Sequence, residues 1–204
     1  MSETKIYTDL QTAFERFNAD LFGGKLRPVI FTLNRVRSAR GYFAAQRFAS
    51  RTDDEKRDEI ALNPDAFAER SDLQILSTLL HEMVHLWQQQ FGKPSRKNYH
   101  NKQWADKMED VGLMPSNTGQ PGGKRTGQSM THYIIDEGPF SEIAQRLLDD
   151  GFAIEWASLP IVNTKETSAN KVKYTCPICD LNAWGKPELF IICGECQVNL
   201  EEAA

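Results

Sequence analysis

Three ionisable residues lie close together in the segment HEMVH, which contains His81, Glu82 and His85. Two histidines four residues apart lie one turn apart on the same face of an α-helix, with Cβ atoms about 5–6 Å from each other. Both imidazoles can therefore bind one metal ion, and Glu82 can reach a water molecule on that ion. The spacing predicts a hydrolytic zinc centre in which Glu82 acts as general base and then as general acid.

A catalytic zinc centre needs three protein ligands and one open position. The pattern with a third histidine six positions after the second does not apply, because that position holds Phe91. His100 is the better candidate, since the break at residues 92–94 can turn the chain back past the helix. Asp106 and Glu109 remain open as carboxylate ligands. The alternative is a set of ordinary core histidines, but burying three ionisable groups in an apolar helix is costly without a metal ion.

The elements that must position these residues are indicated by hydrophobic periodicity and capping signals. Ser71, with Gln74 three positions later, forms a capping-box pattern before a long helix that is apolar around most of its circumference and carries HEMVH. An amphipathic helix precedes it and ends at a Gly-Gly pair. The other expected elements are β-rich runs at 28–33, 41–48 and 59–62, a second helical pattern at 104–111, a loop at 115–128, a strand at 131–135, a helix at 140–150 and a final strand at 152–156. This order predicts an α+β domain with an antiparallel or mixed sheet.

The segment LSTLLHEMVHLWQQQFG, followed by YHNKQWADKMEDVGL, resembles the SprT family of zincin-like metalloproteases, which includes the Spartan-type proteases that act on DNA–protein crosslinks. ARGYFAAQRF and EIALNP also resemble strands of that family, so the resemblance covers about residues 5–115. It implies a zincin-like (SprT) metalloprotease domain in which His81, His85 and His100 bind zinc and Glu82 is the catalytic acid and base. It also implies protein substrates that are associated with DNA or crosslinked to it.

All four cysteines lie in two CxxC pairs near the end of the chain, Cys176 with Cys179 and Cys193 with Cys196. In a chain without a secretory signal, this spacing favours a structural four-cysteine zinc site over disulfides, and a thioredoxin-like redox use lacks its βαβ context. Gly194 is expected to relax the second turn. This segment resembles the zinc ribbon that follows the protease core in bacterial SprT-like proteins. Its exposed face could contact nucleic acid through Tyr174 and Trp184, or the two rings could form the ribbon core.

Composition and charge exclude several classes of protein. The 204 residues carry a net charge of -4 and 40% hydrophobic residues, which excludes collagen-like, fully disordered and disulfide-scaffold proteins. Neither a membrane span nor a secretory signal is recognisable, so we expect a cytoplasmic protein, nucleoid-associated if it is bacterial. Residues 21–52 contain seven basic residues and no acidic one. This uneven charge is compatible with a DNA partner and equally with arginines scattered over a solvated surface.

Three segments are expected on these grounds: a SprT-like core at residues 1–115, an extension at 116–165 that completes or covers it, and a small C-terminal four-cysteine zinc ribbon at 166–204. The expected function is a zinc-dependent endopeptidase with one catalytic and one structural Zn²⁺. Its partners would be protein substrates and DNA, either single-stranded or carrying crosslinked protein.

Substrate contacts are expected from a strand and from a lone histidine. Tyr42 and Phe43 lie in a β-rich run that could pair with an extended peptide, and His132 could line the cleft or serve a structural role. Two other functions stay open at this point. One is a DNA- or protein-binding zinc module without efficient proteolysis, and the other is a zinc hydrolase that acts on a small substrate.

Overall fold

The computed structural model describes residues 5–37, 39–96, 99–159 and 171–202. The chain divides into two compact units, Met1–Leu159 and Pro160–Ala204. The predicted boundary between residues 165 and 166 lies outside the described residues, and the boundary at residue 115 stays a proposal. Within the described part of the chain, no helix is long and apolar enough to cross a membrane.

A mixed three-stranded sheet forms one layer of the first unit. Strand β1 (Val29–Leu33) pairs in parallel with β3 (Lys56–Leu62), and β2 (Gly41–Ala49) pairs with β3 in the antiparallel direction. The strand order is β1-β3-β2, so β2 lies at an edge of the sheet. The mixed sheet and the helices beside it confirm the predicted α+β class.

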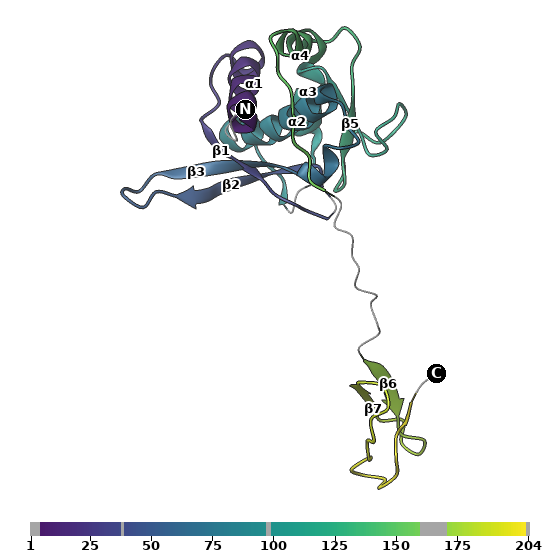
Figure 1. Ribbon diagram of the computed structural model, residues 1–204. Helices are drawn as coiled ribbons and strands as arrows, with labels where there is room; N and C mark the ends of the chain where they lie inside the picture. Colours follow the sequence, from purple (N-terminus) through teal and green to yellow (C-terminus); the bar gives the residue numbers. More distant parts are fainter. Residues whose placement is uncertain (1–4, 38, 97–98, 160–170, 203–204) are drawn as a thin grey trace. The chain divides into compact units, whose positions relative to one another are not determined.

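Two long helices cover one face of this sheet. Helix α1 (Lys5–Phe22) and helix α2 (Asp72–Phe91) lie side by side above the strands in Figure 1. The N-cap Ser71 and the N3 residue Gln74 form the predicted capping box at the start of α2. Most of α2 is buried, as its all-round apolar pattern predicts, because it packs against the sheet and against other helices. The histidines of HEMVH are thereby held on a rigid, buried element.

The rest of the unit adds two helices and a hairpin. Strands β4 (Leu113–Ser116) and β5 (Thr131–Ile134) form an antiparallel hairpin that follows α3 (Lys102–Asp110), and α4 (Pro139–Asp149) comes after it. A short 3-10 helix spans Pro64–Ala66. Phe140 and Leu147 of α4 belong to the same hydrophobic core as α1 and α2.

Two details of the prediction are wrong. The loop expected from residue 115 begins inside β4, which was not predicted. The strand expected at 152–156 does not form. The Phe152 N–H donates to the Leu147 carbonyl at 2.9 Å and the Ile154 N–H to the Asp72 carboxylate at 3.2 Å, so these backbone groups bond to the ends of helices.

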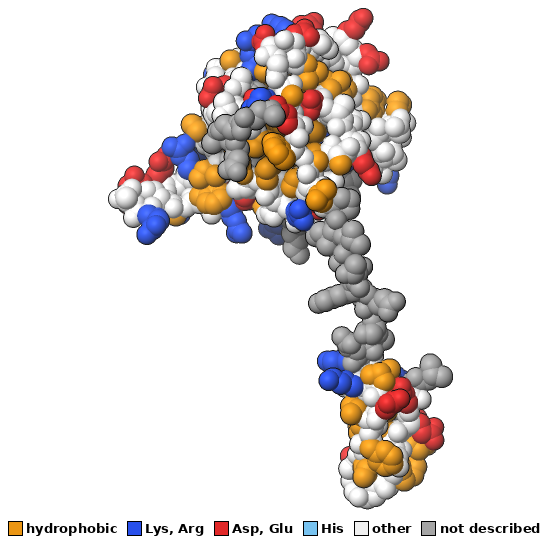
Figure 2. Space-filling model, in the orientation of Figure 1, with side chains coloured by type: hydrophobic (Ala, Val, Ile, Leu, Met, Phe, Trp, Pro, Cys, Tyr) orange, Lys and Arg blue, Asp and Glu red, His pale blue; other side chains and the backbone are white. Residues whose placement is uncertain are grey.

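The second unit is a small ribbon built from three strands. Strands β6 (Val172–Thr175), β7 (Asn182–Gly185) and β8 (Glu201–Glu202) form a sheet in the order β7-β6-β8. Tyr174 belongs to its core, where the phenol donates to the Lys186 carbonyl at 2.6 Å and accepts from the Leu189 N–H at 2.9 Å. Trp184, by contrast, is 64% exposed. Figure 2 shows several hydrophobic side chains at the surface of this ribbon.

Candidate active site

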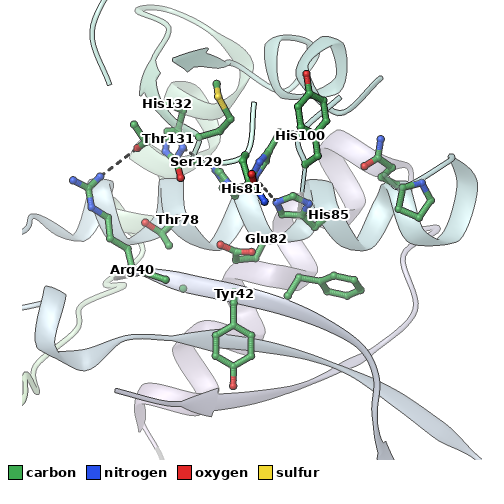
Figure 3. Close-up of a pocket in the computed structure, with 18 of the residues that line it drawn as sticks. Arg40, Tyr42, Thr78, His81, Glu82, His85, His100, Ser129, Thr131 and His132 are labelled. Carbon is green, nitrogen blue, oxygen red and sulfur yellow. Dashed lines mark hydrogen bonds between the residues drawn. The ribbon is translucent and has the colours of Figure 1, made fainter. Parts of the chain in front are cut away.

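Three imidazoles converge in the first unit. The ligand nitrogens of His81, His85 and His100 all lie within 4.8 Å of one another, and the side chains meet above α2 in Figure 3. The Nε2 atoms of His85 and His100 are 3.1 Å apart. Nitrogens bound to a tetrahedral zinc ion at 2.0–2.1 Å lie about 3.3 Å from each other. The donor set and its spacing therefore fit a zinc ion.

The loop after β4 determines which nitrogen of His100 faces this cluster. His100 and Gly127 form a backbone bridge, with N–H to carbonyl distances of 2.8 and 3.1 Å. The Nδ1 atom of His100 lies 3.2 Å from the Gly127 carbonyl. A carbonyl only accepts hydrogen bonds, so Nδ1 carries the proton and Nε2 keeps its lone pair. His100 thus presents a ligand nitrogen to the other two histidines.

A chain of hydrogen bonds orients His81 in the same way. Ser77 Oγ donates to the Gln74 carbonyl at 2.9 Å, so it accepts from His132 Nε2 at 3.0 Å. Burial lowers the pKa of His132 to about 3, which keeps this ring neutral and leaves its Nδ1 as an acceptor. His81 Nδ1 lies 3.1 Å from His132 Nδ1 and must donate to it. The proton is therefore on Nδ1 of His81, and the Nε2 lone pair is free for a metal ion.

Glu82 is buried beside this cluster, with 6% of its surface exposed. Burial raises the pKa of its carboxyl to about 8, although a hydrogen bond from the Phe43 backbone N–H acts in the opposite direction. This bond ties the carboxylate to strand β2. A carboxylate with a pKa near neutrality is suited to take up and to release a proton during catalysis.

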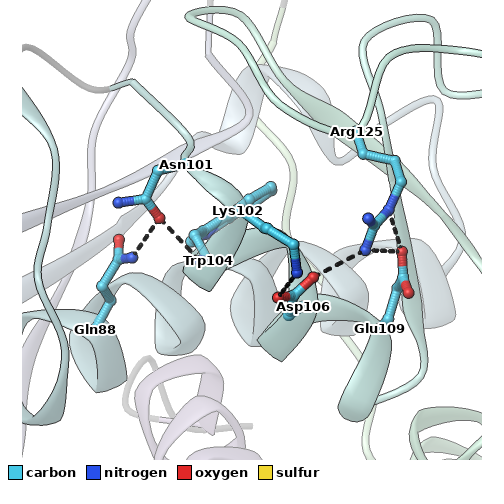
Figure 4. Close-up of polar contacts among 7 residues, drawn as sticks. All are labelled: Gln88, Asn101, Lys102, Trp104, Asp106, Glu109 and Arg125. Atoms are coloured by element: carbon cyan, nitrogen blue, oxygen red, sulfur yellow. Dashed lines mark hydrogen bonds and ion pairs between the residues drawn. The ribbon is translucent and has the colours of Figure 1, made fainter.

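Aromatic packing and a helix cap hold His100 in place. Trp104 is fully buried and lies against all three histidines, with ring centroids 4.3 Å apart for His100 and 5.4 Å apart for His85. The side-chain oxygen of Asn101, the N-cap of α3, accepts from the backbone N–H of Trp104 at 3.1 Å and from Gln88 Nε2 at 2.8 Å, as Figure 4 shows. The start of α3 is therefore fixed to α2 close to the cluster.

The two alternative carboxylate ligands have other partners. Asp106 and Glu109 bind the guanidinium of Arg125 (Figure 4), and Asp106 also pairs with Lys102. Among the described residues they do not join the histidine cluster. Arg125 instead fixes the loop that contains Gly127, the partner of His100. This loop is thus part of the wall of the site.

A cleft of about 680 Å³ contains the cluster and Glu82. The start of β2 forms one of its walls, and residues 128–132 form another. Phe43 packs against the core and donates its N–H to Glu82. Tyr42 lines the cleft, but its ring points away from Glu82 (Figure 3), and its hydroxyl accepts from Asn34 at 2.8 Å. Of the three suggested substrate contacts, His132 lies in the cleft next to His81, whereas Tyr42 directs its side chain elsewhere.

Comparison with known families agrees with this geometry. The chain matches the SprT-like family model over residues 10–126, which is more than half of its length. The chain belongs to the SprT-like family. No curated protein and no solved structure matches it. Membership supports a SprT-type metalloprotease-like domain for the first unit, in agreement with the suggested resemblance.

The second unit of this SprT-like protein holds the four cysteines in one cluster. Their sulfurs lie within 4.8 Å of one another, and the Sγ atoms of Cys179 and Cys193 are 3.7 Å apart. Sulfurs bound to a tetrahedral zinc ion at 2.3 Å are about 3.8 Å apart. Hydrogen bonds from the backbone N–H groups of Cys179 and Ile178 lower the pKa of Cys176 to about 7, while the neighbouring Cys179 raises the pKa of Cys196. A bound cation would stabilise the thiolate forms of the cysteines that it binds.

The expectation for Gly194 is wrong. A Cβ atom at Gly194 would meet no heavy atom within 4 Å, and its φ is not positive. The left-handed conformation lies instead at the residue after each CxxC pair, with φ of 58° at Asp180 and 53° at Gln197. The two turns are thus built alike, and neither needs a glycine.

Sequence reasoning missed the groups that orient the histidines. Ser77 lies four residues before His81 in α2, and this spacing, which places both side chains on the same helical face, was an available signal. The role of the Gly127 carbonyl could not be predicted in this way, because every residue has a backbone carbonyl and the residue type does not show which one accepts a hydrogen bond from His100. Both groups act on the imidazoles without belonging to the metal cluster.

Proposed function

We propose that this SprT-like protein is a zinc-dependent endopeptidase in which His81, His85 and His100 hold the catalytic zinc ion and Glu82 is the general base and acid. The observation that carries the proposal is the convergence of three lone-pair nitrogens beside a buried carboxylate in one cleft. A purely structural site has no need of Glu82. No described residue forms an ion pair with Glu82, so its burial costs free energy, and a buried carboxyl with a raised pKa in a cleft is typical of a catalytic acid or base.

Each of these residues would have a separate role in hydrolysis of the peptide bond. When bound, zinc supplies a Lewis acid that makes water nucleophilic near neutral pH. Glu82 takes the proton from the attacking water and delivers it to the amine that leaves when the peptide bond breaks. The Phe43 N–H holds the carboxylate in place, and His132 keeps the proton of His81 on Nδ1. The open edge of β2 would bind the substrate as an added strand.

We propose that the four cysteines hold a second, structural zinc ion in the ribbon. Four protein ligands close such a site, so it contributes folding energy and no catalysis. The ribbon has a very small buried core, which makes a metal ion the main source of its stability.

The proposed substrates are proteins associated with DNA or crosslinked to it, and the proposed location is the cytoplasm or a bacterial nucleoid. The resemblance to Spartan-type proteases supports the proposal on substrates. The arginines between residues 21 and 52, of which Arg40 lines the cleft, would contribute to DNA affinity. The affinity for single-stranded oligonucleotides should then fall as the salt concentration rises.

The test compares wild-type protein with Glu82→Gln. Both should bind zinc with equal affinity, because the three proposed ligands are histidines and Glu82 is not one of them. Cleavage of a DNA-bound protein should fall by at least about 100-fold in the variant, the usual contribution of a general acid and base. Wild-type cleavage by Glu82→Gln would overturn the proposal. DNA binding by a zinc-loaded protein that cleaves no protein under any condition would instead favour a binding module.

A further inference from the structure

The cleft carries an uneven charge. Arg40 is the one residue with a permanent charge among the described residues that line it, since Glu82 is a buried carboxyl with a raised pKa. Arg40 lies at the end of the cleft where β2 begins, as Figure 3 shows, and its backbone carbonyl accepts from the Asn63 N–H at 2.9 Å. Its guanidinium is exposed and makes one long contact, at 3.4 Å, with the Thr131 hydroxyl.

A second arginine lies behind the first. Arg70 is partly buried and donates to the Thr78 hydroxyl at 2.8 Å and to the Gln74 carbonyl. Burial lowers the pKa of Arg70 to about 10, and the nearby charge of Arg40 acts in the same direction. Within the described part of the chain, no carboxylate forms an ion pair with Arg40 or Arg70. Two positive charges thus repel each other near one end of the cleft, and no described carboxylate neutralises them.

We infer that Arg40, supported by Arg70, forms a subsite for a carboxylate of the substrate. A guanidinium that makes a single long hydrogen bond has donors free for a bidentate contact with a carboxylate. A negative charge placed there would also relieve the repulsion between the two arginines. The inference rests on the proposed peptidase function and adds to it a preference for acidic peptides.

The distance along α2 determines where in the substrate this carboxylate lies. Thr78, which lines the cleft beside Arg40, precedes His81 and Glu82 by three and four residues, which corresponds to about 4.5–6 Å along the helix. An extended peptide advances about 3.3 Å per residue. The carboxylate should therefore belong to a residue within about two positions of the cleaved bond. It can come from an Asp or Glu side chain or from a free C-terminus.

Peptide series distinguish these sources. In one series Glu, Gln or Lys is placed at each of the three positions on either side of the cleaved bond, and in the other the C-terminus is a free acid or an amide. In one of the two series, the wild-type protein should prefer the carboxylate: either the Glu peptide over the Gln peptide at one position, or the free acid over the amide. The kcat/KM of the preferred peptide should be on the order of tenfold higher. In Arg40→Gln this ratio should fall to about one, and Arg40→Glu should favour Lys. Arg37→Gln is the matched control, because Arg37 is exposed and does not line the cleft.

A binding measurement keeps the test independent of turnover. Zinc-loaded Glu82→Gln should bind the Glu peptide more tightly than the Gln peptide, and the added Arg40→Gln substitution should abolish the difference. If no peptide is cleaved, the proposed function fails, and this binding measurement alone decides the subsite. Equal affinity for both peptides overturns the inference. It is also overturned if Arg40→Gln weakens binding of a single-stranded oligonucleotide while the peptide preference is unchanged, since the arginine would then serve a phosphate.

Discussion

The hydrogen bond between His132 and His81 should set the affinity of the proposed catalytic zinc site. His81 is 8% exposed, so water cannot easily replace His132 as the acceptor for its Nδ1–H. In His132→Phe, this N–H is left buried without a partner, at a cost of about 1–3 kcal/mol. The ring can avoid that cost by moving the proton to Nε2, but this removes the lone pair that would bind the metal. By either route, we expect zinc to bind roughly 10–100-fold more weakly.

The measurement is a competition between the full-length protein and a chelator, with zinc release followed by a colorimetric indicator at pH 7.5. Zinc in the ribbon serves as an internal reference, since it should leave in a separate phase that the substitution does not change. Thermal unfolding of each variant checks that the first unit stays folded.

Two further variants separate orientation from simple loss of packing. His132→Asn places an amide oxygen near the position of Nδ1 and keeps the acceptor, so its zinc affinity should stay close to that of the wild type. His132→Gln places its amide near the position of Nε2 and keeps the contact with Ser77 alone, so it should resemble His132→Phe. If His132→Phe holds zinc as tightly as the wild type, or if His132→Asn loses as much affinity as His132→Phe, the role assigned to this hydrogen bond is wrong.

Three further predictions concern the loop, the pH dependence and the ribbon. Arg125→Ala should weaken zinc binding by about 3- to 10-fold in the same assay, because the loop that supports His100 loses two partly exposed ion pairs. Arg47→Ala, a substitution outside the loop and the cleft lining, should have no effect on zinc affinity. Equal losses of zinc affinity in both variants would contradict the reasoning. Chelator-treated protein should lose stability as the pH falls below 6.5, because burial lowers the pKa of His85 and of His132 to about 3 whereas the unfolded rings take up protons near pH 6.5. Each of the two should cost about 1.4 kcal/mol at pH 5.5. Burial raises the pKa of Glu82 to about 8, so this carboxyl contributes stability that is lost as the pH rises from about 4.5 to about 8. The comparison by urea unfolding at pH 7.5 and 5.5 therefore uses Glu82→Gln, and equal stability at both values would refute the prediction. Cys176→Ser should release the ribbon zinc and unfold the ribbon, as measured by metal content and by NMR of its amides. The melting temperature of the first unit should stay within about 2 °C of the wild type. A large fall in that melting temperature would show that the first unit depends on the ribbon.

The parts of the fold that local signals encode could be predicted from the sequence. The capping box at Ser71 and the all-round apolar pattern define α2, and HEMVH places two imidazoles on one of its faces. These signals lie within a few residues of each other, so periodicity and spacing suffice to find them. The position of His100 beside them depended on a turn of the chain, and the structure places it there.

Features that depend on contacts between residues far apart in the sequence could not be predicted from local signals. Strand β4 was missed because Pro115 disfavours a strand, yet β4 pairs with β5 on one side in the described structure, so the missing N–H costs little. The expected strand at 152–156 fails because helix ends supply its hydrogen-bond partners. His132 was noticed as a lone histidine, but its partner His81 is 51 residues away, and no spacing rule links them.

The backbone bridge between His100 and Gly127 has a consequence for the order in which the site can form during synthesis. A ribosome makes the chain from its N-terminus, and HEMVH emerges well before Gly127 and His132. Until those residues are made, His100 lacks its carbonyl partner and His81 lacks its acceptor. A growing or prematurely terminated chain therefore contains the HEMVH motif before the groups that orient His81 and His100 are present.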